Sequence, residues 1–196
     1  GFDYTVSDGT LTDTGHVTVT VTAVNDAPVA VDDTATTAED TPVNIPAATL
    51  IANDTDVDGP ALSLTAVSNP TNGTVNLVSG TITFTPTANF NGTAGFDYTV
   101  SDGTLTDTGH VTITVTAVND APVAVDDTAS TAEDTPVNIL DSTLLSNDTD
   151  VDGPSLSLTG VSNPTNGTVS LLSGTITFTP TANFNGTAGF DYTVTD

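Results

Sequence analysis

The chain has 196 residues with no lysine, no arginine and 25 acidic residues, so its formal net charge is −25. This charge excludes nucleic acid as a partner, because no basic side chain can meet a phosphate, and it disfavours anionic membranes. Cysteine is absent, which excludes disulfides and thiolate metal sites. No apolar run is long enough to span a bilayer, so we expect no direct membrane insertion.

A repeat of 94 residues organises the whole chain. The segment 1–6 recurs at 95–100 and at 189–194, and the segment 25–28 recurs at 119–122. A unit of this length has the size of one small sandwich domain and is too long for a solenoid turn. We therefore expect three parts: the C-terminal strands of a preceding repeat over 1–24, a complete repeat over 27–118, and a following repeat over 121–196 that lacks its last strand.

Short alternating segments predict strands throughout the repeat. Valine alternates with threonine over 16–22, and aromatic or apolar residues alternate with polar ones over 96–100. The segments 74–78 and 81–85 flank residues 79–80, Ser-Gly, which form a two-residue hairpin turn. No segment has a helical period, and we expect no helix. About seven strands in each repeat predict an all-β fold of tandem Greek-key β-sandwiches, and the regular alternation argues against disorder.

Clustered acidic side chains supply the candidate chemistry. The segment 53–59, repeated at 147–153, places oxygen-bearing side chains at alternate positions before a glycine. In a loop, such side chains converge on one hard cation, and Ca²⁺ accepts about six to eight oxygens in irregular loops, whereas Mg²⁺ requires a stricter octahedron. The same residue types are ordinary turn formers. Three aspartates within five positions, in a chain without any basic side chain, favour calcium over a simple turn.

The motifs of the chain resemble a cadherin repeat junction. Residues 100–103 match the segment before the last strand of a cadherin repeat, and 118–122 match the linker that ends in proline. Glu133 matches the lone glutamate of the next domain, and 150–152 match its Asp-x-Asp loop. The threonine-rich, lysine-free style is similar to bacterial cadherin-like tandem repeats of large secreted (RTX-type) adhesins. The resemblance covers the whole chain and implies Ig/cadherin-like sandwiches with calcium at their junctions.

The resemblance also implies a set of calcium ligands. The first junction would use Asn25, Asp26, Asp56, Asp58 and Asp102. The second junction would use Glu39, Asn119, Asp120, Asp150, Asp152 and Asp196, and the predicted set also includes Asp54, Glu133 and Asp148. Two departures from the cadherin pattern reduce the expected ions to one or two per junction. The leading aspartate of the linker is replaced by Ala117, and the loop 87–92 has no acid where cadherins carry Asp-Arg-Glu.

Other conspicuous side chains are expected to be structural. We predict solvated strand starts at Asp32, Asp33, Asp126 and Asp127, surface or packing roles for His16 and His110, and core or corner positions for Tyr4, Tyr98 and Tyr192. The acids lie in repeated turn loops, and an active site duplicated in every repeat is improbable. We therefore predict that the chain is not an enzyme.

These observations predict a structural, calcium-stiffened repeat of an extracellular bacterial adhesin or surface filament. Its partners would be neighbouring identical repeats head to tail, and other copies in a filament or biofilm. The alternative is an adhesion module for carbohydrate or for a like repeat on another cell surface, although only 5% of residues are aromatic. Two hypotheses describe the ends of the chain: a window on a longer covalent array, or strand exchange in which residues 1–24 of one copy complete 121–196 of another.

Overall fold

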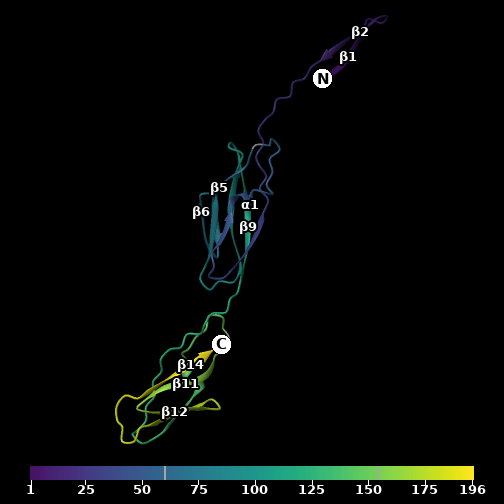
Figure 1. Cartoon of the computed structure of the whole chain (residues 1–196). Helices are drawn as coiled ribbons and strands as arrows, with labels where there is room; N and C mark the ends of the chain where they lie inside the picture. Colours follow the sequence, from purple (N-terminus) through teal and green to yellow (C-terminus); the bar gives the residue numbers. More distant parts are fainter. Residues whose placement is uncertain (60, 154) are drawn as a thin grey trace. The chain divides into compact units, whose positions relative to one another are not determined.

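The computed structural model describes residues 1–59, 61–153 and 155–196 (Figure 1). Contacts within the chain divide it into two compact units, unit 1 over 1–116 and unit 2 over 117–196, which are described separately. Strands dominate both units and only 4% of residues are helical, so the predicted all-β fold is confirmed. In the described part of the chain, no helix has the length and apolarity that a membrane crossing requires.

Unit 1 begins with a hairpin of β1 (Phe2–Ser7) and β2 (Thr12–Val17), which form a two-stranded antiparallel sheet of their own. All six residues of β1 are exposed. The core position predicted for Tyr4 is therefore wrong, because β1 packs against no second sheet among the described residues. The strand predicted over 16–22 ends at Val17, because the described residues offer 18–22 no neighbouring strand with which to pair.

The rest of unit 1 is a sandwich of two sheets. Its elements are β3 (Asp33–Ala38), β4 (Val43–Pro46), α1 (Ala47–Leu50), β5 (Ser63–Thr71), β6 (Gly73–Val78), β7 (Thr81–Pro86), β8 (Gly92–Ser101) and β9 (Thr106–Thr116). One sheet has the order β3-β9-β8-β5 and the other has the order β4-β7-β6. β3 and β9 are parallel, and the other neighbours are antiparallel. The predicted turn between β6 and β7 is confirmed, with positive φ at Ser79 and Gly80.

The helix α1 corrects the prediction that the chain has no helix. It is a single turn of four residues, too short to leave a helical period in the sequence, and it follows β4 directly. Its Ala47 N–H donates to the Gly80 carbonyl over 2.9 Å, and its Leu50 side chain is buried. The turn therefore closes one end of the sandwich between β4 and the β6–β7 hairpin.

The core of unit 1 follows the alternation of its strands. The buried apolar residues are Ile45, Leu50, Ile82, Phe84, Ala94, Phe96, Tyr98, Val100, Val111, Ile113 and Val115. β9 contributes every second residue from Val111 to Val115, as its alternation of apolar residues and threonine predicts. Phe84 and Phe96, one from each sheet, stack with ring centroids 6.1 Å apart. The core role predicted for Tyr98 is confirmed, because its side chain is fully buried.

Unit 2 repeats part of this architecture. Its elements are β10 (Val137–Leu140), α2 (Asp141–Leu144), β11 (Ser157–Thr165), β12 (Gly167–Leu172), β13 (Thr175–Pro180) and β14 (Gly189–Thr195). They form the sheets β10-β13-β12 and β11-β14. The described residues of unit 2 supply no counterpart of β9. The segment 127–132, which differs from β3 only by serine in place of Thr36, is not a strand.

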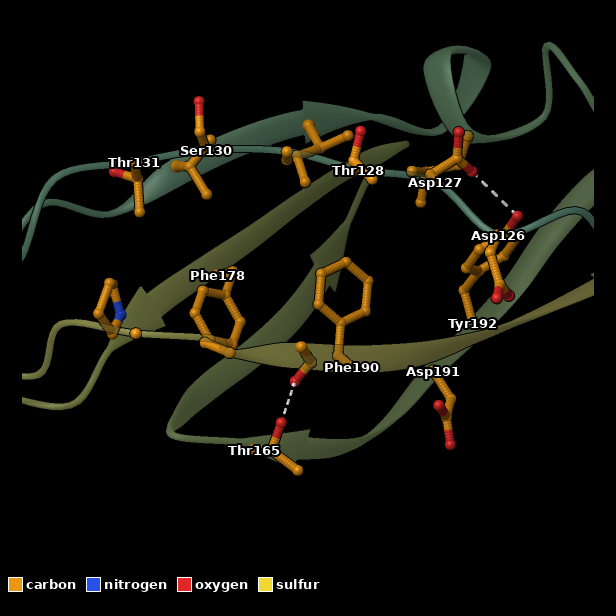
Figure 2. A pocket seen from close by; sticks show the side chains of 18 of the residues that line it. Asp126, Asp127, Thr128, Ser130, Thr131, Thr165, Phe178, Phe190, Asp191 and Tyr192 are labelled. Carbon is orange, nitrogen blue, oxygen red and sulfur yellow. Dashed lines mark hydrogen bonds between the residues drawn. The ribbon is translucent and has the colours of Figure 1, made fainter.

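A groove of about 880 Å³ in unit 2 lies where β9 lies in unit 1. Figure 2 shows the segment 126–131 along one side of the groove and β14 with Phe190 and Tyr192 along the other. Phe190 stacks on Phe178 at 6.0 Å, as Phe96 stacks on Phe84. Phe190 and Tyr192 are only half-buried, because no strand covers them in the described structure.

Candidate metal centres

In unit 1, an acidic cluster forms around Asn25 and Asp26, directly before the sandwich. The Asn25 amide donates to Asp102 Oδ2 over 2.8 Å, and the Asp26 N–H donates to Asp58 Oδ2 over 2.7 Å. The Asp58 N–H in turn donates to Asp56 Oδ1 over 2.8 Å. The structure thus brings together the five residues predicted for the first junction.

Backbone hydrogen bonds in a turn hold the Asp102 carboxylate of this cluster in place. The Asp102 Oδ1 accepts the N–H groups of Thr104 and Leu105 over 2.6 and 2.7 Å, which closes the turn between β8 and β9. These backbone donors, the Leu105 N–H first, together with the Asn25 amide, hold the pKa of Asp102 below its ordinary value. With Oδ1 engaged in the turn, the Asp102 Oδ2 accepts the Asn25 amide.

Unit 2 contains the same cluster. The Asn119 amide donates to Asp196 Oδ2, and the Asp120 N–H donates to Asp152 Oδ2 over 2.7 Å. The Asp152 N–H donates to Asp150 Oδ1 over 2.8 Å. The five residues that the second junction draws from 117–196 are therefore also close together. The recurrence of each contact shows that the repeated sequence, and not one accidental loop conformation, produces this geometry.

Each cluster contains a carboxylate oxygen that is buried and receives no hydrogen bond, Oδ2 of Asp56 and Oδ2 of Asp150. Burying a charged oxygen without a donor is unfavourable, and a cation beside it would compensate for the missing donor. In the described part of the chain, no three carboxylate or imidazole groups are arranged to hold a metal ion by themselves. An ion here would also need amide and backbone carbonyl oxygens, which Ca²⁺ accepts.

Asp54 and Asp148, which were also predicted as ligands, each bond within the sandwich through Oδ1, and their Oδ2 atoms are buried without a hydrogen bond. Asp54 is 9% exposed, and its Oδ1 accepts the Val31 N–H over 2.8 Å and lies 2.9 Å from the Tyr98 hydroxyl. Asp148 Oδ1 accepts the N–H of Val125 over 2.8 Å and lies 3.2 Å from the Tyr192 hydroxyl. These two aspartates therefore fasten the segment that enters each sandwich to Tyr98 in unit 1 and to Tyr192 in unit 2.

Asp33 corrects the prediction of a solvated strand start. Its Oδ2 is buried without a donor, its Oδ1 accepts the Asn53 amide over 3.2 Å, and burial raises its pKa. Asp33 and Asp54 both act on Tyr98, whose pKa is raised by burial first and by these carboxylates next. Sequence reasoning missed this group because Asp33 precedes an exposed-looking run of threonine and alanine. In unit 2 the counterpart Asp127 is exposed, as predicted, but it does not start a strand.

The two glutamates of the predicted set lie outside the hydrogen bonds described above for the clusters. Glu39 follows the last residue of β3 and is 3% exposed, and its N–H donates to the carbonyl of Thr116 over 2.9 Å. Glu133 is exposed. The histidines pair with aspartates across strands: His110 Nδ1 lies 2.7 Å from Asp97 Oδ1, and His16 makes the same contact with Asp3.

A family model for the cadherin-like domain matches residues 24–116 and 118–196. The chain belongs to the cadherin-like domain family. The predicted Ig/cadherin-like fold of tandem repeats of about 94 residues is thereby confirmed. No curated protein matches this cadherin-like chain by sequence.

Solved structures offer only distant similarity. An endo-fucoidan hydrolase from glycoside hydrolase family 107 is 18% identical at a TM-score of 0.37, and the alignment covers 97% of this chain and 33% of the hydrolase. The I-band fragment I67-I69 from titin is 12% identical at a TM-score of 0.25, with 85% and 63% covered. This chain spans about a third of the length of the hydrolases that it matches. Similarity at these TM-scores carries no argument about activity or partners.

Proposed function

We propose that this cadherin-like chain is a calcium-stiffened structural repeat of an extracellular bacterial adhesin or surface filament, without enzymatic activity. The observation that carries the proposal is the acidic cluster that recurs where the chain enters the sandwich of each unit. In both copies, the cluster joins residues of the entering segment to loops of the sandwich and contains a buried carboxylate oxygen without a donor.

The negative charge of the chain explains why a cation at the cluster would stabilise the fold. With a net charge of −25 and no basic side chain, the folded chain repels itself, and only cations from solution can offset that repulsion. A calcium ion held by the residues of one cluster would bind the entering segment to the sandwich more firmly than the present hydrogen bonds do. The residues that would hold it are Asn25, Asp26, Asp56, Asp58 and Asp102 in unit 1, and Asn119, Asp120, Asp150, Asp152 and Asp196 in unit 2.

An extracellular setting suits such a site. Calcium sites of extracellular modules commonly bind with dissociation constants of about 10⁻⁴ to 10⁻³ M, which intracellular calcium does not reach. Nearly identical repeats also suit a spacer, in which each copy has the same task. In this proposal the repeats extend a ligand-binding part of the protein away from the cell.

Thermal unfolding of the whole chain tests the calcium site. We expect Ca²⁺ to raise the melting temperature above that in chelator, and Mg²⁺ to raise it much less, because the loops do not offer an octahedron. A metal that binds only the folded state stabilises it by about 2.7 kcal/mol at a concentration of 100 Kd. A melting temperature that chelator leaves unchanged would contradict the proposed calcium site.

A matched pair of variants assigns the effect to the cluster. Asp56→Asn removes one charge from the cluster of unit 1, whereas Asp13→Asn removes one charge from the exposed hairpin. We expect Asp56→Asn to weaken calcium binding at one of two sites and Asp13→Asn to leave both intact, as measured by calorimetric titration. Equal losses for the two variants would show that calcium responds only to total charge.

Small-angle scattering tests the stiffening separately. The segment 118–122 carries Asn119 and Asp120, and calcium held there should restrict its motion. We expect a larger maximum dimension in Ca²⁺ than in chelator. Equal dimensions in both conditions would contradict the stiffening and leave the metal site standing.

A further inference from the structure

The loop between β7 and β8 contains an asparagine with a free side-chain amide. Asn91 is exposed, and its side chain makes no hydrogen bond to any residue that the structure describes. It lies directly before Gly92, the first residue of β8. Asparagine is a chemically labile residue, and a glycine after it lets the next backbone nitrogen approach the amide carbon without a side chain in the way.

The backbone requires glycine at position 92. The φ of Gly92 is +127°, which L side chains rarely adopt, and a Cβ there would meet the Phe90 ring at 3.4 Å. Gly92 faces Val115 in the terminal pair of the ladder between β8 and β9, and the ends of strands open locally at little cost in free energy. The fold therefore keeps an Asn-Gly step at a place where the backbone can open.

The second Asn-Gly step of the same sandwich is held closed. Asn72 donates its amide to the Thr93 carbonyl over 2.9 Å, and its own carbonyl accepts the Thr87 N–H over 3.0 Å. A Cβ at Gly73 would lie 2.4 Å from the Phe84 ring, so the backbone is tightly packed at this step. Rotation of the Asn72 side chain toward the Gly73 nitrogen would break the amide hydrogen bond, and we expect Asn72 to stay intact.

Asn89, two positions earlier in the loop, shows why the glycine matters. Its side chain also makes no hydrogen bond within the described part of the chain, but the residue that follows it is Phe90. The Phe90 N–H donates to the Thr87 carbonyl over 3.1 Å, and the Phe90 side chain packs against the core. The nitrogen after Asn89 is therefore fixed in a turn and shielded by a ring, whereas the nitrogen after Asn91 is not shielded.

We propose that Asn91 is a site of spontaneous deamidation, which converts its neutral amide into a carboxylate without an enzyme. The Gly92 nitrogen attacks Asn91 Cγ and gives up its proton, the bond from Cγ to the amide nitrogen breaks, and ammonia leaves a cyclic succinimide behind. Water then adds to one of the two ring carbonyls and opens the ring to aspartate or isoaspartate. The attack is favoured because both reacting atoms belong to one short stretch of chain. The proposal does not depend on calcium.

The conversion changes both the charge and the backbone of the repeat. It adds a negative charge to a chain that has no lysine or arginine, in a loop that already contacts Asp40 through the Asn89 N–H. Isoaspartate also carries the main chain through Cβ, which lengthens the backbone directly before β8. The segment 87–92 recurs as 181–186, so an array of such repeats would become more acidic with age.

Incubation of the folded 196-residue chain at mildly alkaline pH tests the proposal, with tandem mass spectrometry of proteolytic peptides to measure the acid formed at each asparagine. We expect Asn91 to convert at least about tenfold faster than Asn72, because the Asn72 amide must first break a hydrogen bond. In urea that unfolds the chain, the two sites should convert at similar rates, because Gly-Thr follows both. Equal rates in the folded chain, or an Asn91 that converts only in urea, overturn the proposal.

A matched pair of variants identifies the reacting side chain. Asn91→Gln keeps a neutral amide but places its carbon one bond further from the next nitrogen, so the acidic form of the peptide that covers 87–96 should no longer accumulate. Asn89→Gln makes the same change in the same loop and should leave that accumulation unaltered. Asn91→Asp supplies the aspartate form as a chromatographic reference, from which isoaspartate separates. Undiminished accumulation in Asn91→Gln, or its loss in Asn89→Gln, overturns the proposal.

Discussion

The sandwich of unit 1 and unit 2 repeat nearly the same sequence, and their structures differ at the place of β9. Phe96 and Tyr98 of unit 1 are fully buried, whereas their counterparts Phe190 and Tyr192 in unit 2 are half-buried. The neighbouring strands are equivalent, since β13 and β11 of unit 2 correspond to β7 and β5 of unit 1. The segment 33–38 is a strand, but the segment 127–132 is not. The comparison shows that β9 supplies both the cover of the core and the pairing that makes its neighbours strands.

Truncation of the central phenylalanines should give the largest difference in lost stability between the two units. Phe96→Ala removes a fully buried ring and should lower the free energy of unfolding of unit 1 by about 3–5 kcal/mol. Phe190→Ala removes a ring that solvent already reaches in part, so we expect a loss of roughly half that size. Hydrogen exchange measured separately for peptides of each unit reports both values. Equal losses would mean that unit 2 is as well covered in solution as unit 1.

Alanine at the paired glycines should give the next largest difference. Gly95→Ala forces a methyl group against the Val111 carbonyl and should destabilise unit 1 by about 1–3 kcal/mol. Gly189→Ala has open space and should leave the stability of unit 2 unchanged. Chemical unfolding of the two variants checks this prediction. Destabilisation of unit 2 by Gly189→Ala to the same extent would contradict the prediction.

Removal of the tyrosine hydroxyls should give a smaller difference between the stability losses of the two units. The Tyr98 hydroxyl lies 2.9 Å from both the Val31 carbonyl and Asp54 Oδ1 in a buried setting. Tyr98→Phe should therefore cost about 1 kcal/mol in unit 1. Tyr192→Phe should cost less, because its hydroxyl contacts lie closer to solvent. Thermal unfolding monitored by exchange in each unit compares the two, and a larger loss at Tyr192 would contradict the prediction.

The pair of His110 and Asp97 should have the smallest effect on stability, and this effect should appear at acidic pH. The His110 ring, followed by the Asn69 amide, holds the pKa of Asp97 below its ordinary value. A lowered pKa in the folded state means that ionised Asp97 adds stability above about pH 4, and this contribution is lost as the pH falls through the lowered pKa. His110→Gln should shrink this loss in unit 1 by less than about 1 kcal/mol, because the pair is only partly buried and solvent screens it.

Urea unfolding of the wild type and of His110→Gln at about pH 5 and pH 3 checks the last prediction. Unit 2 is the internal control, because its counterpart Asp191 bonds to Asn163 and has no such histidine within its described residues. The same change in both units would show that the acid response reflects the total charge of the chain.

The sequence predicts the repeat, the strand alternation and the hairpin turn because each depends on neighbours within a few residues. The alternation of Val111, Ile113 and Val115 gives their inward direction directly. The sequence also predicts the acidic loop, because Asp56 and Asp58 lie two positions apart. The position of Asp33 could not be predicted, because its burial depends on β9, about 80 residues further along the chain. The exposure of Tyr4 and the absence of a strand over 18–22 depend in the same way on a partner strand that local sequence does not reveal.

The parallel pairing of β3 and β9 has a mechanical consequence. β3 opens the sandwich of unit 1 and β9 closes it, and the two strands lie side by side in register from Asp33 beside Val111 to Ala38 beside Thr116. Tension on the flanking chain pulls these strands in opposite directions along their length. The ladder is therefore loaded in shear, so that its hydrogen bonds must break together, whereas a hairpin pulled from its open end unzips one bond at a time. We expect the sandwich of unit 1 to resist stretching until a sudden rupture, as single-molecule pulling would show.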